Sequence, residues 1–285
     1  MDQRIIELYD EYTHAPLDRR VFMERLIVLT GSVAAAQAAL TFLSPDYALA
    51  AIVDEKDARI ETASGTDTAS GLKIYTATPK AVKAESANNL VIVIHENRGL
   101  NPHIQDIVRR LAVTGFTALA VDLLTPLGGT PADEDVARDM FPKLDLTKAT
   151  ASIIAIIDDR KKRNANLKAG VIGFCWGGGM VNAVATAAPN LDAGIVYYGN
   201  SPRLENVANI KAKMMFHYAG LDKRINDTVP AYEDAMKKAR VKYEIFMYDK
   251  VNHAFNNDTG KERYADAAAK LAWSRTTDFL KAALR

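Results

Sequence analysis

The chain contains a single cysteine, and its surroundings favour a catalytic role. Cys175 stands in the stretch GFCWGGG at 173–179, a G-x-C-x-G-G pattern in which cysteine replaces the serine of a nucleophile elbow. An apolar run ends just before it and glycines follow, so we expect a strand, a tight turn and a helix. Such a turn would hold the sulfur at a helix N-terminus, whose partial positive charge favours a thiolate and a developing oxyanion. A buried structural cysteine is the alternative.

A cysteine nucleophile needs a base and a group that orients the base. In a fold with a nucleophile elbow, the acid and then the histidine follow the nucleophile along the chain. Asp222 ends the motif AGLD after one apolar run, and His253 stands in the motif NHAF after a later one. The order predicts Asp222 as the acid and His253 as the base. An ordinary turn aspartate and a surface loop histidine are the alternatives, and no pattern supports a role for His14 or His103.

A second acid is expected at the same edge of the sheet. The apolar run LVIVI at 90–94 leads into HENRG, which contains Glu96. The loop after an early central strand supplies the second amide of the oxyanion hole in this kind of fold. We therefore expect the backbone N–H groups of Asn97 and Trp176 to form the hole, with each donor worth about 3 kcal/mol. Glu96 is either a catalytic carboxylate or a solvated loop residue paired with Arg98.

The motifs HENRG, GFCWGGG, AGLD and NHAF, in this order and spacing, resemble the dienelactone hydrolase family of α/β-hydrolases. The resemblance covers roughly residues 70–285, and the part before it resembles that of a longer bacterial subgroup. It implies that Cys175 is the nucleophile, Asp222 the triad acid and His253 the base. It also implies that Glu96 contacts the resting cysteine and helps to switch it on when substrate arrives.

The resemblance implies hydrolysis of carboxylic esters or lactones through a thioester. Members that act on dienelactones hold the substrate carboxylate with arginines, one of them four residues after the triad histidine, where this chain has Asn257. Our candidates for substrate contact are Arg98, Phe255 and Tyr198. A general carboxylesterase and a hydrolase of thioesters or activated phosphoesters remain as alternatives on the same fold. A relic that binds a ligand without turnover is an alternative of another class.

The elements that must position these residues alternate along the chain from about residue 61. Short apolar runs predict strands, and amphipathic stretches between them predict helices. This alternation predicts an α/β-hydrolase fold, with a mostly parallel central sheet, helices on both faces and an N-terminal helical extension. The predicted strands are 71–78, 90–95, 116–121, 169–174, 193–198, 213–219 and 243–248, and the predicted helices are 102–114, 146–163, 177–188, 229–239 and 263–284.

Residues 1–60 form a separate N-terminal segment in our interpretation, before a catalytic domain at 61–285. The uncharged run at 26–45 follows the pair RR at 19–20 and precedes ALA at 48–50. This order resembles a twin-arginine export signal with its cleavage site. Acidic residues before the arginines and only moderate hydropathy favour instead a retained helical extension packed on the catalytic domain. We accordingly expect a cytoplasmic protein, with a periplasmic one as the alternative.

Composition narrows the classes of partner. The 285 residues include 36 Lys and Arg against 35 Asp and Glu, a formal net charge of +1, which lacks the positive field of a nucleic-acid-binding protein. One cysteine forms no internal disulfide, and no Cys/His cluster has the sequence spacing of a metal site. We expect a small-molecule ester or lactone as the substrate, with no nucleic acid, stable membrane insertion, metal or cofactor. The sequence leaves the oligomeric state open.

Overall fold

A single eight-stranded sheet forms the centre of the molecule. The computed structural model describes residues 1–15, 17–47, 52–81 and 89–284. The strands are β1 (Ile60–Thr66), β2 (Lys73–Pro79), β3 (Leu90–Ile94), β4 (Thr117–Asp122), β5 (Ala169–Phe174), β6 (Ala193–Tyr197), β7 (Lys213–Ala219) and β8 (Tyr243–Tyr248). Their order is β1-β2-β4-β3-β5-β6-β7-β8. Strand β2 runs antiparallel to β1 and β4, and all other neighbours are parallel. The predicted mostly parallel sheet is confirmed.

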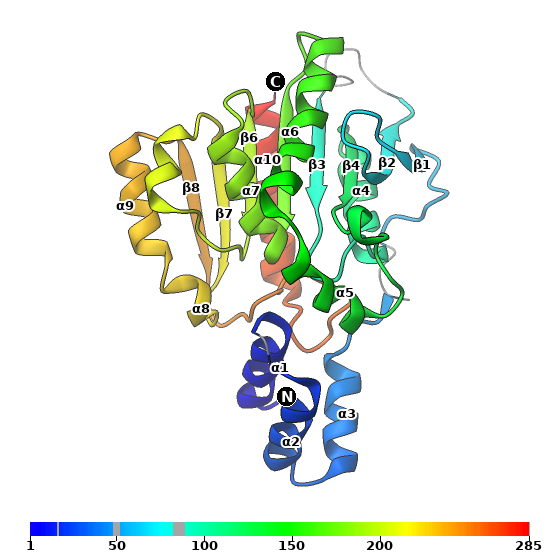
Figure 1. The fold of residues 1–285 in the computed structure, drawn as a ribbon, viewed down its shortest axis with the longest axis vertical. Coiled ribbons are helices and arrows are strands. Elements are labelled where there is room, and N and C mark those ends of the chain that lie inside the picture. The colour runs from blue at the N-terminus through cyan, green and yellow to red at the C-terminus, as the bar shows by residue number, and fades with distance from the viewer. Residues whose placement is uncertain (16, 48–51, 82–88, 285) are drawn as a thin grey trace.

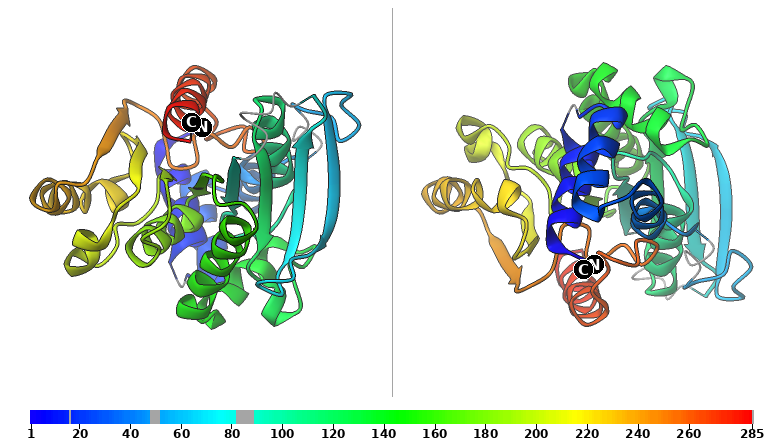
Figure 2. Two further views of the ribbon diagram at one scale, coloured as in Figure 1. Left: turned by 90° about the horizontal axis from the view of Figure 1, so that it is seen from above. Right: turned by 90° about the horizontal axis from the view of Figure 1, so that it is seen from below.

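Helices cover both faces of this sheet (Figure 1; Figure 2). Those on one face are α4 (Pro102–Val113) and α10 (Asp266–Ala283), and those on the other are α6 (Leu146–Arg163), α7 (Trp176–Ala187) and α9 (Val229–Ala239). All five residues of β3 are buried, as expected for a parallel strand between two helical layers. The α/β-hydrolase architecture predicted from the alternating pattern is thereby confirmed.

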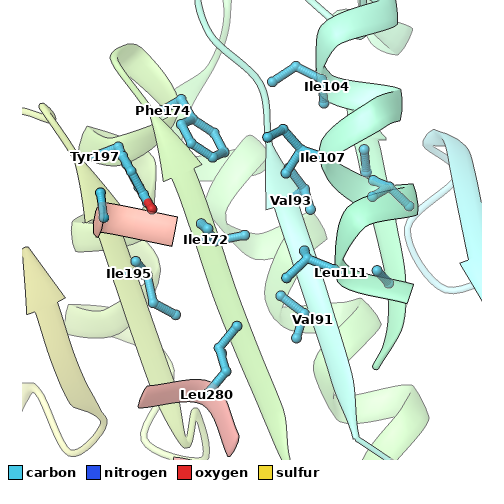
Figure 3. Close-up of a cluster of buried hydrophobic side chains, with 14 of the residues drawn as sticks. Val91, Val93, Ile104, Ile107, Leu111, Ile172, Phe174, Ile195, Tyr197 and Leu280 are labelled. Carbon is cyan, nitrogen blue, oxygen red and sulfur yellow. The ribbon is translucent and has the colours of Figure 1, made fainter. Parts of the chain in front are cut away.

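Apolar packing between the sheet and α4 fixes the position of strand β3 and of the loop that follows it (Figure 3). Val91 and Val93 of β3 point toward α4, where Ile104, Ile107 and Leu111 form one apolar stripe. All five side chains are fully buried. Residues spaced three and four apart lie on one side of a helix, so this spacing locks α4 against the strand. The loops that follow the strands therefore start from a rigid frame.

Strand β1 and the short helices α5 (Glu134–Met140) and α8 (Lys223–Asn226) of the catalytic domain are absent from the elements predicted from the sequence. Strand β1 pairs along its whole length with β2 at the sheet edge, and four of its last five residues are exposed. An edge strand of this kind carries no apolar run, so its composition gives little signal. Helix α5 lies in the connection after β4 and buries only Ala137, which is too little to produce a periodic pattern.

The N-terminal segment lies below the carboxyl ends of the strands (Figure 1). It contains α1 (Gln3–His14), α2 (Arg19–Thr30) and α3 (Val33–Leu43), each preceded by a side chain that caps its first turn. The three helices bury a small apolar core of their own, around Tyr9, Tyr12, Phe22 and Leu26. The packed helical extension predicted for this region is therefore present in the described residues.

The uncharged run at 26–45 is divided between two helices. Gly31 ends α2 with a φ of 81°, Ser32 caps α3, and the two helices meet at 110°. In the part of the chain that the structure describes, no helix taken singly has the length and apolar character to cross a bilayer; α2 and α3 reach them only as a bent pair. The arginine pair begins α2, where Arg19 pairs with Asp135. The ALA motif at 48–50 lies outside the described residues.

Candidate active site

Cys175 occupies a tight turn between β5 and α7. Its φ of 55° and ψ of −118° lie outside the regions that side-chain-bearing residues normally adopt. A Cβ on Gly177 would stand 2.4 Å from the carbonyl oxygen of His95, so only glycine lets the loop after β3 approach the turn. Cys175 is 6% exposed. The result is the strand, turn and helix that GFCWGGG predicts, with the sulfur at the carboxyl edge of the sheet.

Asp222 and His253 meet beside this turn. Asp222 follows β7 and caps α8 (Lys223–Asn226), and His253 lies in the loop after β8. Oδ2 of Asp222 and Nδ1 of His253 are 2.5 Å apart, and both residues are only 4% exposed. A ring nitrogen of His253 lies within 4.8 Å of the Cys175 sulfur. The structure therefore brings together the three residues singled out from three distant loops.

Glu96 lies in the same buried region but is held by another residue. Its Oε2 accepts a hydrogen bond of 2.9 Å from Nδ2 of Asn257, the position where an arginine would contact a substrate carboxylate. Oε1 is buried and has no hydrogen-bond partner among the described residues. Within residues 1–15, 17–47, 52–81 and 89–284, no hydrogen bond joins Glu96 to Cys175, whose sulfur lies 3.0 Å from Nε2 of His14. Both residues line the same small cavity, and the contact of Glu96 with the resting cysteine stays a prediction.

The two residues expected to form the oxyanion hole flank the sulfur. Trp176 is the first residue of α7, so its backbone N–H has no acceptor four residues earlier within the helix. Asn97 follows β3, and both residues line the cleft that contains Cys175. The Asn97 side chain is occupied, since its Nδ2 donates to the carbonyl oxygen of Thr13 at 2.5 Å.

The three candidates for substrate contact lie in different surroundings. Arg98 donates to the Glu134 carbonyl oxygen at 3.0 Å and thereby contacts α5. Phe255 is fully buried, with the rings of Tyr198 and Tyr248 packed against it. Tyr198 lines the large cleft at the nucleophile, and neither Arg98 nor Phe255 does. Arg98 instead lines the small cavity beside Cys175 and His253, and contact of the three residues with substrate stays a prediction.

A cleft of about 930 Å³ reaches the sulfur from the side of α5. Its lining is partly apolar and partly cationic, and includes Arg138, Phe141, Leu144, Trp176, Arg224 and Ile225. A second cavity of about 20 Å³, between Cys175, Glu96 and Tyr47, has room for about one water molecule. The cleft is large enough for a small-molecule substrate.

The site contains one residue that the sequence did not indicate. Nε2 of His14, the last residue of α1, lies 3.0 Å from Sγ of Cys175. Its Nδ1 lies 2.8 Å from the Asp10 carbonyl oxygen and 3.2 Å from the Asp10 carboxylate, and its ring meets that of His253 edge-on at 4.5 Å between centroids. The only signal in the sequence is the spacing of Asp10 and His14, which places them one helical turn apart.

The electrostatics favour a charged sulfur. Burial opposes a thiolate at Cys175, but the imidazoles of His14 and His253 outweigh burial and lower the pKa of the thiol to about 6. Burial likewise opposes a charge on His253, yet the carboxylates of Asp10 and Asp222 and the sulfur raise its pKa to about 10. Despite burial, Cys175 and Asp10 also raise the pKa of His14. At neutral pH these directions describe a thiolate beside protonated imidazole.

Two groups of side chains in the described residues have donor atoms close enough together to hold a metal ion. They are His14 with Cys175 and His253, and Asp10 with Asp222 and His253, with all donor atoms of each group within 4.8 Å. The hydrogen bonds His14–Cys175 and Asp222–His253 already use these donors. We interpret the hydrogen-bonded members of these groups, His14–Cys175 and Asp222–His253, as proton-transfer pairs.

Known proteins resemble both parts of the chain. The model of the dienelactone hydrolase family matches residues 72–284, and a family model described as YqhI-like matches residues 1–29. A Saccharolobus solfataricus protein named "Putative carboxymethylenebutenolidase" is 32% identical over 247 residues, which cover 74% of this chain and 93% of the relative. A Salmonella typhi protein of the same name is 31% identical over 222 residues, covering 72% and 80%.

Solved structures extend the comparison to the fold. A structure named "Putative Dienelactone Hydrolase" from Klebsiella pneumoniae has 27% identity and a TM-score of 0.69, covering 76% of this chain and 96% of that one. A "Dienelactone Hydrolase-like" promiscuous phosphotriesterase from metagenomic libraries has 19% identity and a TM-score of 0.65, covering 79% and 98%, and shows the fold alone. The resemblance predicted from the four motifs is confirmed: the chain belongs to the dienelactone hydrolase family and is a hydrolase of ester bonds.

Proposed function

We propose that this chain hydrolyses carboxylic esters or lactones through a thioester on Cys175. The observation that carries the proposal is the meeting of a sulfur on a strained strand-to-helix turn with an Asp222–His253 pair of 2.5 Å. A nucleophile, a base and a group that orients the base are the parts that acyl transfer by covalent catalysis requires. The cleft supplies a route for a small substrate to the sulfur.

The reaction follows from these positions. An imidazole takes the proton of Cys175, with His253 held by Asp222 as the expected base, and the thiolate attacks the carbonyl carbon. The backbone N–H groups of Trp176 and Asn97 stabilise the oxyanion. The alcohol leaves with a proton from imidazole, and a thioester forms. Water that gives its proton to His253 then releases the acid and restores the cysteine.

Glu96 is proposed to take part through its free oxygen. Its Oε2 is fixed by Asn257, while Oε1 is buried without a partner among the described residues. A buried carboxylate oxygen without a partner favours acceptance of a hydrogen bond from a substrate. Glu96 would thus respond to substrate entry, as the family resemblance implies.

Turnover by Cys175→Ala tests the proposal directly. We expect hydrolysis of a chromogenic ester to fall at least about 10³-fold, because the variant has no group to form the acyl intermediate. Cys175→Ser, measured beside it, keeps a hydroxyl at the same position and reports whether sulfur itself is needed. Undiminished turnover by the folded Cys175→Ala protein would remove the mechanism.

The second part of the proposal concerns the substrate, namely its leaving group and its acyl group. Arg138 and Arg224 line the cleft together with Asp18 and Asp139, and Arg138 pairs with Asp139 at 2.9 Å, so both anionic and neutral substrates are candidates. A fold neighbour is named for phosphotriesterase activity. A panel of esters, lactones, thioesters and phosphotriesters, each with and without a free carboxylate, separates these alternatives. Preference for one class by at least tenfold in kcat/KM identifies the substrate class.

We further propose that residues 1–60 remain part of the working protein in the cytoplasm. Helix α1 contacts the nucleophile through His14, so removal of the segment would change the site. Mass spectrometry of the protein recovered from its host is the test. The full mass supports retention, and an N-terminus near residue 51 contradicts it and indicates export.

A further inference from the structure

Two Asp–His pairs, one from each part of the chain, meet at a single sulfur. In the first pair, Asp222 holds Nδ1 of His253. In the second, Nδ1 of His14 is hydrogen-bonded to the backbone carbonyl oxygen of Asp10 at 2.8 Å, with the Asp10 carboxylate 3.2 Å away, and Nε2 of His14 contacts Cys175 at 3.0 Å. A hydrogen-bond acceptor at Nδ1, the Asp222 carboxylate for His253 and the Asp10 carbonyl oxygen for His14, fixes the tautomer and directs Nε2 outward. Both pairs therefore present the nitrogen that exchanges protons to the same buried region.

Helix α1 is anchored to the loops that form the site. Nδ2 of Asn97, beside the expected oxyanion hole, donates to the carbonyl oxygen of Thr13 at 2.5 Å. Nε2 of Gln3 donates to Oδ1 of Asn252, next to His253, at 2.7 Å. The guanidinium of Arg263 lies over the Tyr9 ring, 5.0 Å from its centroid. These contacts fix the position of His14 from three sides.

His14 does not close the route to the nucleophile. The cleft of about 930 Å³ is lined by both His14 and Cys175, so a substrate can reach the sulfur while α1 stays in place. A segment that merely blocked the site would separate the sulfur from the cleft. The arrangement instead makes His14 part of the wall that a substrate would touch.

We propose that His14 is a catalytic residue, which takes the proton of Cys175 in the resting enzyme and holds the sulfur as a thiolate. The inference rests on the proposed role of Cys175 as nucleophile. The N-terminal segment therefore completes the active site. The position of His14 as the last residue of α1 assists, because the C-terminus of a helix favours a cation. The lowered pKa of Cys175, to about 6, has the same direction.

In the proposed reaction, His14 transfers the protons while the thioester forms, and His253 transfers them while it is hydrolysed. The S–H proton moves to Nε2 of His14, the thiolate forms a bond with the carbonyl carbon, and the tetrahedral intermediate collapses with cleavage of the C–O bond. The departing alkoxide takes the proton from His14. In the second half, water gives a proton to Nε2 of His253 and its oxygen bonds to the thioester carbon. The C–S bond breaks, and the sulfur receives the proton from His253.

Other ionisable groups face the proton that moves between Cys175 and His14, and they contribute to any titration of the thiol. They come from all the elements packed around the sulfur. These groups are Asp10 of α1, Glu96 after β3, Tyr198 after β6, Asp222 and Arg224 at α8, and His253 and Arg263 in the segment between β8 and α10. A test must therefore compare variants that differ in His14 and keep the rest.

The pH dependence of Cys175 alkylation by iodoacetamide measures the thiol pKa without turnover. We expect an inflection near pH 6 in the unmodified protein. In His14→Gln the inflection should rise by about 1–3 pH units, because a cation next to the sulfur is lost. Glu7→Gln is the matched control, since Glu7 is exposed on the same helix and its loss should leave the inflection unchanged. The same inflection in His14→Gln as in the unmodified protein would overturn the inference.

Chemical rescue separates a catalytic role from a structural one. His14→Ala leaves space for a free ring, so added imidazole should restore at least about half of the lost low-pH alkylation rate. Pyrazole, a ring of the same size that stays unprotonated at neutral pH, should restore none. Equal rescue by both, or by neither in a variant with unchanged circular dichroism, would contradict the inference. Undiminished ester turnover by Cys175→Ala would instead remove the proposed function and leave these titrations interpretable.

Discussion

The two Asp–His pairs at Cys175 depend on different kinds of structure. Asp222 and His253 lie on loops that follow β7 and β8, two neighbouring strands of the central sheet. Asp10 and His14 lie on one turn of α1, in a segment with its own small apolar core. The first pair is positioned by strand register, and the second by the docking of a helix. One site thus combines a part that the central sheet positions with a part that a separate N-terminal segment supplies.

Substitution of His253, the histidine in the loop after β8, should have the largest effect on activity. His253→Gln is expected to lower kcat/KM about 10³–10⁴-fold, as loss of a triad member does. His14→Gln should lower it less, because His253 can still take the proton. Steady-state kinetics with one ester measures both. An equal fall of kcat/KM in the two variants would mean that the two pairs are equivalent, and would contradict the separate roles given to them.

A substitution in the small apolar core of α1, α2 and α3 should have an effect of intermediate size on the active site. Phe22→Ala removes a fully buried ring from this core and should destabilise the segment by about 3 kcal/mol. The thiol pKa should then rise toward that of His14→Gln, while the Asp222–His253 pair stays intact. Thermal unfolding and alkylation measure the two effects.

Val28→Ala is the matched control for this prediction. Val28 lies on the same helix as Phe22 but is 81% exposed. It should change neither stability nor thiol pKa. A Phe22→Ala protein with a destabilised segment and an unshifted thiol pKa would show that docking of α1 does not set the state of the sulfur.

The pH profile should give the smallest effect. Since the pKa of Cys175 is lowered to about 6 and the thiolate is the reactive form, kcat/KM should fall about tenfold at one unit below that pKa. In His14→Gln the acid limb should move to higher pH. An acid limb at the same pH in both proteins would assign the lowered thiol pKa to His253 alone.

The sequence predicted the part of the site that the sheet positions. GFCWGGG specifies the turn at Cys175 because a Cβ at Gly177 would meet backbone, and the order of acid and histidine follows from the strand order. His14 could not be found in this way, because its approach to the sulfur depends on tertiary docking of α1. A spacing of four residues between Asp10 and His14 is common on helix surfaces.

The fold was predictable to a similar extent and for a similar reason. Buried strands such as β3 are apolar along their whole length, and their bounds follow from that run. Strand β1 is mostly exposed at the sheet edge, so pairing with β2 rather than composition defines it. The division of the uncharged run at Gly31 follows from a left-handed φ and a Ser32 cap. These are local signals that a hydropathy average hides.

Trapping of the acyl-enzyme tests whether Cys175 forms a thioester during turnover. Intact-mass spectrometry after rapid acid quench of a slow ester substrate should show one added acyl group, and digestion should place it on the peptide that contains Cys175. Cys175→Ala should show no addition under the same conditions. An acyl group on another residue would contradict a thioester on Cys175. A burst of product followed by steady turnover, with no acyl adduct on the protein, would contradict it as well.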